Sequence, residues 1–144
     1  MTIPFTRLAP DAKSPARSHP TDAGYDLCCI DDNNTRRPLH PGERRLFSTG
    51  LILAIPSGFY GHICDRSGNA LKRGLHVLGG ICDASYRGPI GVILLNTSDD
   101  PIWLKAGDRI AQLLIKRHES PLFMEVASLD NTDRGVGGFG STGS

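Results

Sequence analysis

The chain has 144 residues, a length typical of one domain, and 39% of them are hydrophobic, which is enough to form a buried core. Sixteen basic and fifteen acidic residues give a net charge of +1, which disfavours a nucleic-acid binder that relies on bulk positive charge. The apolar runs are far shorter than the ~20 residues of a membrane span, and no secretory signal pattern opens the chain. We therefore expect an intracellular, soluble protein without a membrane partner, in a compartment that the sequence does not indicate.

Short strand-like runs separated by turn residues recur at intervals of about ten residues, a pattern typical of a β-sandwich or barrel. In chain order, the predicted strands are 3–8, 25–30, 44–49, 51–55, 59–64, 76–78, 90–96, 102–104, 109–116 and 122–128. One short helix is predicted over Ser67–Arg73, with Ser67 as its N-cap. The apolar spacing of 110–116 also fits a helical face, and only the short length of this segment favours a strand.

The cysteines and histidines carry no recognisable metal or redox motif. Cys28, Cys29, Cys64 and Cys82 form no C-x-x-C pair, so we expect reduced thiols that are mostly buried. The five histidines are scattered without ligand spacing. The sequence therefore predicts no zinc site.

The last eleven residues, 134–144, are rich in glycine and contain one arginine and one phenylalanine. Such a segment buries too little apolar surface to order itself, so it is either a frayed end or a flexible arm. Arginine, hydroxyl groups and glycine N–H groups are also the parts of a phosphate cradle, and the aromatic ring suits a base. Composition alone does not separate these two interpretations.

Two further clusters are ambiguous when each is taken alone. Arg66, Ser67 and Gly68 open the predicted helix and suit an anion, although from these three residues alone an ordinary capped helix is the favoured interpretation. Asp83 stands in an otherwise apolar hairpin, as a turn residue or as a general base, with Tyr86 placed to pack against a flat ligand.

Taken in order, these clusters are five motifs that closely resemble those of the trimeric dUTPase family, over about residues 3–143. The motifs are Ala23-Gly24-Tyr25-Asp26-Leu27, Arg66-Ser67-Gly68, Gly80-Ile81-Cys82-Asp83 with Tyr86-Arg87-Gly88, Gly107-Asp108-Arg109-Ile110-Ala111-Gln112-Leu113, and Arg134-Gly135-Val136-Gly137-Gly138-Phe139-Gly140-Ser141-Thr142-Gly143.

The resemblance implies an all-β, jelly-roll-like β-barrel over residues 1–133, with 109–116 as a strand. It implies a homotrimer with active sites at the subunit interfaces, each closed by the C-terminal arm 134–144 of a chain. It also implies hydrolysis of dUTP to dUMP and pyrophosphate, which limits uracil incorporation into DNA and supplies dUMP for dTMP synthesis. No direct binding to nucleic acid is expected.

The resemblance also assigns roles. Asp83 would activate the water that attacks the α-phosphorus, and Asp26 would hold Mg²⁺ through water. Tyr86 would pack on the deoxyribose, and the hairpin around 78–83 would recognise uracil through its main chain. Phe139 would stack on the base. The residues implied to bind substrate are Arg66, Ser67, Gly68, Gly80, Ile81, Asp83, Tyr86, Gln112, Arg134, Phe139, Gly140, Ser141 and Thr142.

Four residues depart from the family pattern, among them Cys82 and Ser85, which replace the more usual apolar and acidic residues of the third motif and contribute no obvious chemistry. Asp65 stands where proline is common, and it would either weaken triphosphate binding or pair with Arg66 or Lys72. Asn69 stands where leucine is usual. Two other functions compete with dUTP hydrolysis, namely dCTP deamination on the same fold and a nucleotide-bound signalling trimer. The complete arm and the hairpin that carries Asp83 favour the hydrolase.

Overall fold

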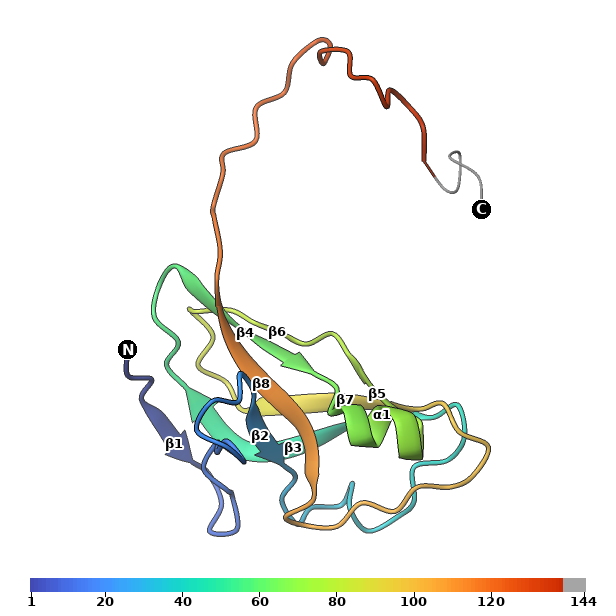
Figure 1. The fold of residues 1–144 in the computed structure, drawn as a ribbon. Coiled ribbons are helices and arrows are strands. Elements are labelled where there is room, and N and C mark those ends of the chain that lie inside the picture. Colours follow the sequence, from blue (N-terminus) through green and yellow to red (C-terminus); the bar gives the residue numbers. More distant parts are fainter. Residues whose placement is uncertain (139–144) are drawn as a thin grey trace.

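The computed structural model describes residues 1–138 and consists mainly of two four-stranded antiparallel sheets (Figure 1). The first sheet has the strand order β1 (Phe5–Arg7), β3 (Arg44–Leu53), β7 (Ile90–Asn96) and β5 (Leu75–Leu78). The second has the order β2 (Tyr25–Cys28), β8 (Arg109–Arg117), β4 (Phe59–Cys64) and β6 (Ile81–Cys82). The helix α1 (Ser67–Arg73) connects β4 of one sheet to β5 of the other. Neighbours within a sheet are distant in sequence, so the topology brings the separate motifs together.

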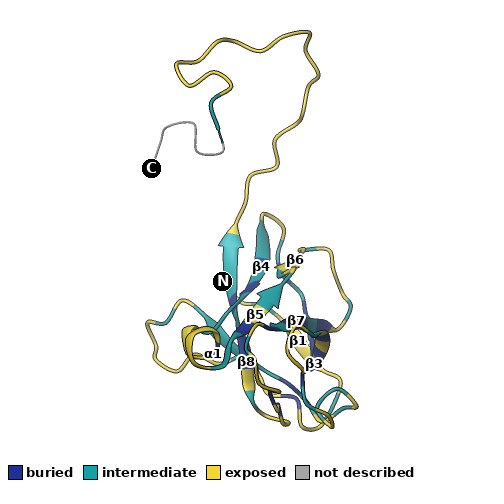
Figure 2. Cartoon of the chain, turned by 90° about the vertical axis from the view of Figure 1, so that its right-hand side faces the viewer, coloured by how far each residue is buried: buried dark blue, intermediate teal, exposed yellow. Residues whose placement is uncertain are grey.

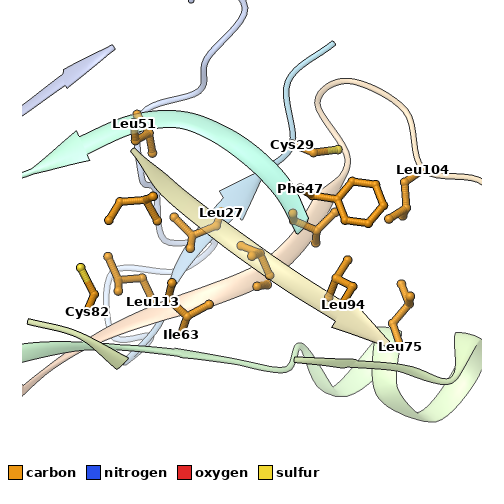
Figure 3. Packing of buried hydrophobic residues seen from close by; sticks show 14 of the residues in the cluster. Leu27, Cys29, Phe47, Leu51, Ile63, Leu75, Cys82, Leu94, Leu104 and Leu113 are labelled. Atoms are coloured by element: carbon orange, nitrogen blue, oxygen red, sulfur yellow. The ribbon is translucent and has the colours of Figure 1, made fainter. Parts of the chain in front are cut away.

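The hydrophobic core lies between the two sheets. Side chains alternate along β7, where Ile90, Val92 and Leu94 are buried and Ile93 is exposed. Figure 3 shows such residues from several strands pointing into one cluster, including Leu27 of β2, Phe47 of β3 and Leu113 of β8. Burying one such side chain contributes about 1.5–3 kcal/mol. The core therefore gives the motif-bearing loops around it a rigid support.

The two strands predicted at 44–49 and 51–55 are one continuous strand, β3, which ends at Leu53. Gly50 has a φ of 66°, and the register with β7 shifts between Ser48 and Leu51, which marks a bulge. A Cβ on Gly50 would lie 2.8 Å from the Cβ of Ala12, so a side chain does not fit there. The prediction divided this stretch at residue 50, whereas Gly50 forms a bulge in one strand that pairs with β7 and β1.

The boundaries of β4, α1 and β7 match the prediction, and 109–116 lies in β8 as a strand. The assignment of Ser67 as N-cap was wrong, because Arg66 occupies that position with φ −88° and ψ 126° and caps without a side-chain hydrogen bond. The short strand β6 was not predicted at all. Within residues 1–138, no helix has the length and apolar character to cross a membrane.

Two predicted strands do not form. Segment 102–104 contributes only an isolated bridge between Ile102 and Leu39. Segment 122–128 was also wrongly predicted, since the chain between β8 and residue 138 contains no strand. It runs away from the two sheets (Figures 1 and 2), with the side chains of Leu122 and Phe123 each 98% exposed. A strand needs a partner for its backbone, and this segment finds none among the described residues of its own chain.

Candidate active site

The first, second and fourth motifs line a pocket of about 430 Å³ at the outer face of the β2–β8–β4 sheet. The sheet register causes this, because Asp26 of β2 and Cys64 of β4 both lie opposite Gln112 of β8. The turn after β4 then adds the start of α1. The predicted residues in this pocket are Asp26, Arg66, Ser67, Gly68 and Gln112.

An ion-pair network is centred on Asp26 of this pocket. Arg66 Nε donates to Asp26 Oδ1 at 2.8 Å, and Arg109 Nη1 donates to Asp26 Oδ2 at 3.2 Å. The Asp26 side chain is 16% exposed, so these bonds are partly shielded from solvent. Arg109 was not among the predicted site residues, although it stands in the fourth motif two positions after Gly107. The signal was present in the sequence, but only the fold shows that Arg109 reaches Asp26.

Asp26 offers a metal ion a carboxylate that belongs to no preformed cluster of ligands among residues 1–138. Among residues 1–138, no group of three or more His, Cys, Asp or Glu side chains is placed to hold a metal ion. Mg²⁺ commonly keeps several waters and binds through one or two carboxylates together with substrate phosphates. One carboxylate that lines a pocket beside two guanidinium groups is compatible with such a hydrated, phosphate-bound ion.

Gln112 is held in one orientation by its surroundings. Its Nε2 donates to the main-chain oxygen of Asp65 at 2.7 Å. A Cβ on Gly24 would collide with Gln112 Oε1, so glycine is needed for this close approach. Asn69, another departure from the family pattern, is buried, and its Nδ2 donates to the main-chain oxygen of Arg109 at 2.9 Å. Asn69 therefore anchors α1 to β8 and does not face the pocket.

The third motif forms a second pocket of about 470 Å³ around segment 78–83, which joins β5 to β6. β5 pairs with β7 and β6 pairs with β4, so the predicted hairpin is a tight turn between the two sheets and not a paired β-hairpin; we keep the name hairpin for segment 78–83. Gly79 and Gly80 have φ values of 75° and 88°, and a Cβ on Gly80 would collide with the main-chain oxygen of Ile63. This lets the hairpin backbone lie directly against β4, where Ile63 N donates to Gly80 O at 2.7 Å. The predicted residues in this pocket are Gly80, Ile81, Asp83 and Tyr86.

Tyr86 and Asp83 are held by the turn that follows β6. The Tyr86 hydroxyl donates to the main-chain oxygen of Pro89 at 3.1 Å, and its ring leaves no space for a Cβ on Gly88. Tyr86 N donates to Asp83 O at 3.1 Å, which closes the turn. Asp83 itself is exposed and lines the pocket. A carboxylate and a fixed aromatic ring therefore share one cavity.

The pKa values of the cysteine thiols in the two pockets are raised, which favours the protonated form. Burial raises the pKa of Cys64, which lines the first pocket. Burial, followed by the nearby charge of Asp83, raises the pKa of Cys82 in the second. Because the thiolate is the nucleophilic form, neither residue is suited to nucleophilic attack.

The predicted site residues are not all brought together in one chain. The two pockets have no lining residue in common among residues 1–138. Arg134 is exposed in the segment that leaves the barrel, and its Nε bonds only locally, to Gly137 O at 2.9 Å. Phe139, Gly140, Ser141 and Thr142 lie outside the described residues.

The comparisons with known proteins bear on these two pockets. The dUTPase family model matches residues 10–143. The chain belongs to the dUTPase family. Two relatives, both deoxyuridine 5'-triphosphate nucleotidohydrolases, come from Nocardia farcinica and Cowpox virus and are 51% and 46% identical. Each alignment covers 98% of this chain, with 85% and 92% of the respective relatives.

A solved dUTPase from Staphylococcus bacteriophage 80alpha, with dUpNHpp, has a TM-score of 0.86 at 29% identity and covers 99% of both chains. A mutant dUTPase from phage phi11 of S. aureus, described with a structural Mg(II) ion, has a TM-score of 0.77 at 26% identity and covers 91% of this chain and all of that one. The family confirms the predicted jelly-roll-like fold and enzyme class. The roles of individual residues in this dUTPase stay predictions.

Proposed function

We propose that the protein hydrolyses dUTP to dUMP and pyrophosphate, and thereby limits uracil incorporation into DNA and supplies dUMP for dTMP synthesis. The observation that carries this proposal is the hairpin pocket, in which Asp83 and the fixed ring of Tyr86 share a cavity with bare glycine backbone. The family membership of the chain supports the same reaction.

The hairpin pocket suits the base and sugar. The main chain around 78–83 offers N–H and C=O groups to the uracil edge at close range, because Gly79 and Gly80 have no side chains. Gly80 and Ile81 line this part of the pocket. The ring of Tyr86 packs on the deoxyribose, where it leaves no room for a 2′-hydroxyl.

The other pocket suits the phosphates. Arg66 offers a planar guanidinium that matches phosphate geometry, and Ser67, Gly68 and Gln112 add neutral donors. Asp26 would hold a hydrated Mg²⁺ through water, and the bound ion would supply positive charge to the phosphates. Arg66 is already paired with Asp26 at 2.8 Å, so the guanidinium is prepositioned at the pocket wall.

Asp83 performs the proton transfer. Its carboxylate orients a water molecule and takes its proton as the oxygen attacks the α-phosphorus, with pyrophosphate as the leaving group. The arm closes the site, where Phe139 stacks on uracil and Arg134, Ser141 and Thr142 hold the terminal phosphates with Gly140 beside them. Burial raises the pKa of the Cys82 thiol in the same pocket, which favours the Asp83 carboxylate as the base.

A simple assay tests the reaction. Purified protein is incubated with Mg²⁺ and dUTP, dCTP, dTTP or UTP, and bases and phosphates are resolved. We expect dUMP and pyrophosphate from dUTP only, since Tyr86 excludes the ribose and the tight hairpin excludes the thymine methyl. Conversion of dCTP to dUTP would indicate deamination, and nucleotide binding without turnover would indicate a signalling module.

The predicted site residues of one chain lie in two separate pockets. A homotrimer would bring one pocket of each kind together from two chains and so complete the site. The segment after β8 supports this arrangement, since it presents exposed apolar side chains to water, including Leu122, Phe123 and Leu129. We infer that a neighbouring copy covers this segment, and that the Asp83 pocket of one chain meets the Arg66 pocket of another.

Sedimentation equilibrium should therefore give three times the 15.5 kDa chain mass. Co-expression of two variants tests the shared site directly. Asp83→Asn and Arg66→Ala are each expected to be nearly inactive alone. Random mixing should recover activity at about a quarter of all sites, because each mixed trimer joins two intact pockets at about one site in three. A fully active monomer, or mixed trimers without recovery, would contradict shared sites.

A further inference from the structure

Asp65, one of the residues that depart from the family pattern, joins the two sheets at the point where α1 begins. Its Oδ2 lies 2.8 Å from His76 Nδ1, and its Oδ1 accepts from Val77 N at 2.6 Å. An ionised carboxylate only accepts hydrogen bonds, so Nδ1 of His76 carries the proton. Arg66 and Lys72 are not its partners, so the pairing considered from the sequence does not form.

The bond from Val77 gives a backbone N–H group at the edge of a sheet a hydrogen-bond acceptor. β5 is the last strand of its sheet, and Val77 pairs with β7 on one side only. The Asp65 carboxylate binds the outward N–H of this strand, which otherwise depends on water. The carboxylate of a residue that follows β4 thus fixes that strand end to the edge of the opposite sheet.

The same residue also supports two predicted phosphate ligands. Its main-chain oxygen accepts from Gln112 Nε2 at 2.7 Å, and Arg66 is the next residue in the chain. Arg66 is the N-cap of α1 and has an extended backbone conformation. The direction of the Arg66 side chain therefore depends on where the backbone of Asp65 is held. The side chain of Asp65 contacts β5, while its backbone contacts a pocket residue.

We propose that Asp65 is a positioning residue, whose carboxylate bonds to His76 and Val77 hold the turn that presents Arg66 and Gln112 to the substrate phosphates. The inference rests on the proposed function, in which these two residues bind phosphate. The carboxylate is 28% exposed and lies outside the residues that line either pocket, so it acts through its neighbours.

Ligands that differ in their phosphates test this role. Affinity is measured for the α,β-imido analogue of dUTP with Mg²⁺, and for deoxyuridine, which carries no phosphate. Asp65→Ala should weaken binding of the imido analogue about tenfold, the factor of one charge-assisted hydrogen bond, and leave deoxyuridine binding unchanged. KM for dUTP should rise in step, with kcat much less affected.

Four further variants separate positioning from stability. Asp65→Asn retains an acceptor for Val77 N and should restore most of the affinity. His76→Ala should shift binding in the same direction as Asp65→Ala but less, and the double variant should be non-additive. Asp32→Ala is the matched control, because Asp32 also accepts backbone N–H bonds, from Asn34 and Thr35, outside both pockets.

The outcomes are distinct. Equal losses for the imido analogue and deoxyuridine, or unchanged binding of both with a lowered melting temperature, would overturn the positioning role. If Asp65→Ala does not fold, the affinities of His76→Ala and Asp65→Asn for the imido analogue and for deoxyuridine test the positioning role in its place. Failure of the wild-type protein to bind the imido analogue would overturn the proposed function. If the wild-type protein binds the analogue and Asp65→Ala binds it with the same affinity, only this inference is overturned.

Discussion

Replacement of Asp83 by asparagine should lower the turnover of dUTP by about 10²–10⁴-fold, the range typical for loss of a general base. Asparagine keeps the shape of the side chain but does not take the proton of the attacking water. Asp83 is exposed, and its main-chain oxygen rather than its carboxylate closes the turn with Tyr86, so the hairpin should persist. Binding of a non-hydrolysable dUTP analogue should therefore remain.

The measurement compares single-turnover rates with analogue affinity for the same preparation. Asp99→Asn serves as the control, because Asp99 is an exposed carboxylate that lines neither pocket. Turnover of Asp83→Asn within a few-fold of the wild type would refute the assignment. Loss of binding together with turnover would instead make Asp83 chiefly a substrate ligand.

Deletion of residues 134–144 should leave the barrel and the trimer intact and reduce turnover severely. The fold is expected to survive because β8 ends at Arg117, and the hydrogen bonds of Arg134, Gly135 and Gly137 are local, reaching back only to Thr132. Turnover should fall because the terminal phosphates lose Arg134 and the base loses Phe139. The deleted protein should keep the melting temperature of the wild type.

The energetics of the arm favour a role for its aromatic ring. Ordering the backbone costs about 1–2 kcal/mol per residue, and glycine loses the most freedom. Stacking of a base on an aromatic side chain contributes about 1–3 kcal/mol, so Phe139 alone does not offset ordering of the whole arm. Phe139→Ala should therefore reduce turnover only in part, with the charge-assisted bonds of Arg134 retained.

Limited trypsin digestion gives a direct check of arm closure. Arg134 is exposed and is the last basic residue of the chain, so cleavage after it removes residues 135–144. We expect cleavage in the free protein and protection by the imido dUTP analogue with Mg²⁺. Equal cleavage with and without ligand, or a truncated enzyme of undiminished rate, would show that the segment has no part in the site.

The strands and helix bounded by strong local turn signals could be predicted from sequence. Proline, serine and glycine at 56–58 precede β4, and Gly74, with a φ of 65°, ends α1. These residues restrict the backbone whatever the rest of the chain does, so the bounds of both elements match. The motifs in the connecting loops were likewise visible, and they were sufficient to predict the family.

What the sequence by itself determined is therefore the set of local elements and the chemistry of the loops, since both follow from residues that are close in the chain. Only the tertiary structure showed that Gly50 forms a bulge in one strand, that Arg109 pairs with Asp26, and that Asp65 binds His76. It also divided the predicted site between two pockets and left 122–128 without a partner strand. Each of these depends on contacts between segments far apart in the chain or on a second copy, and local propensity contains no information about either.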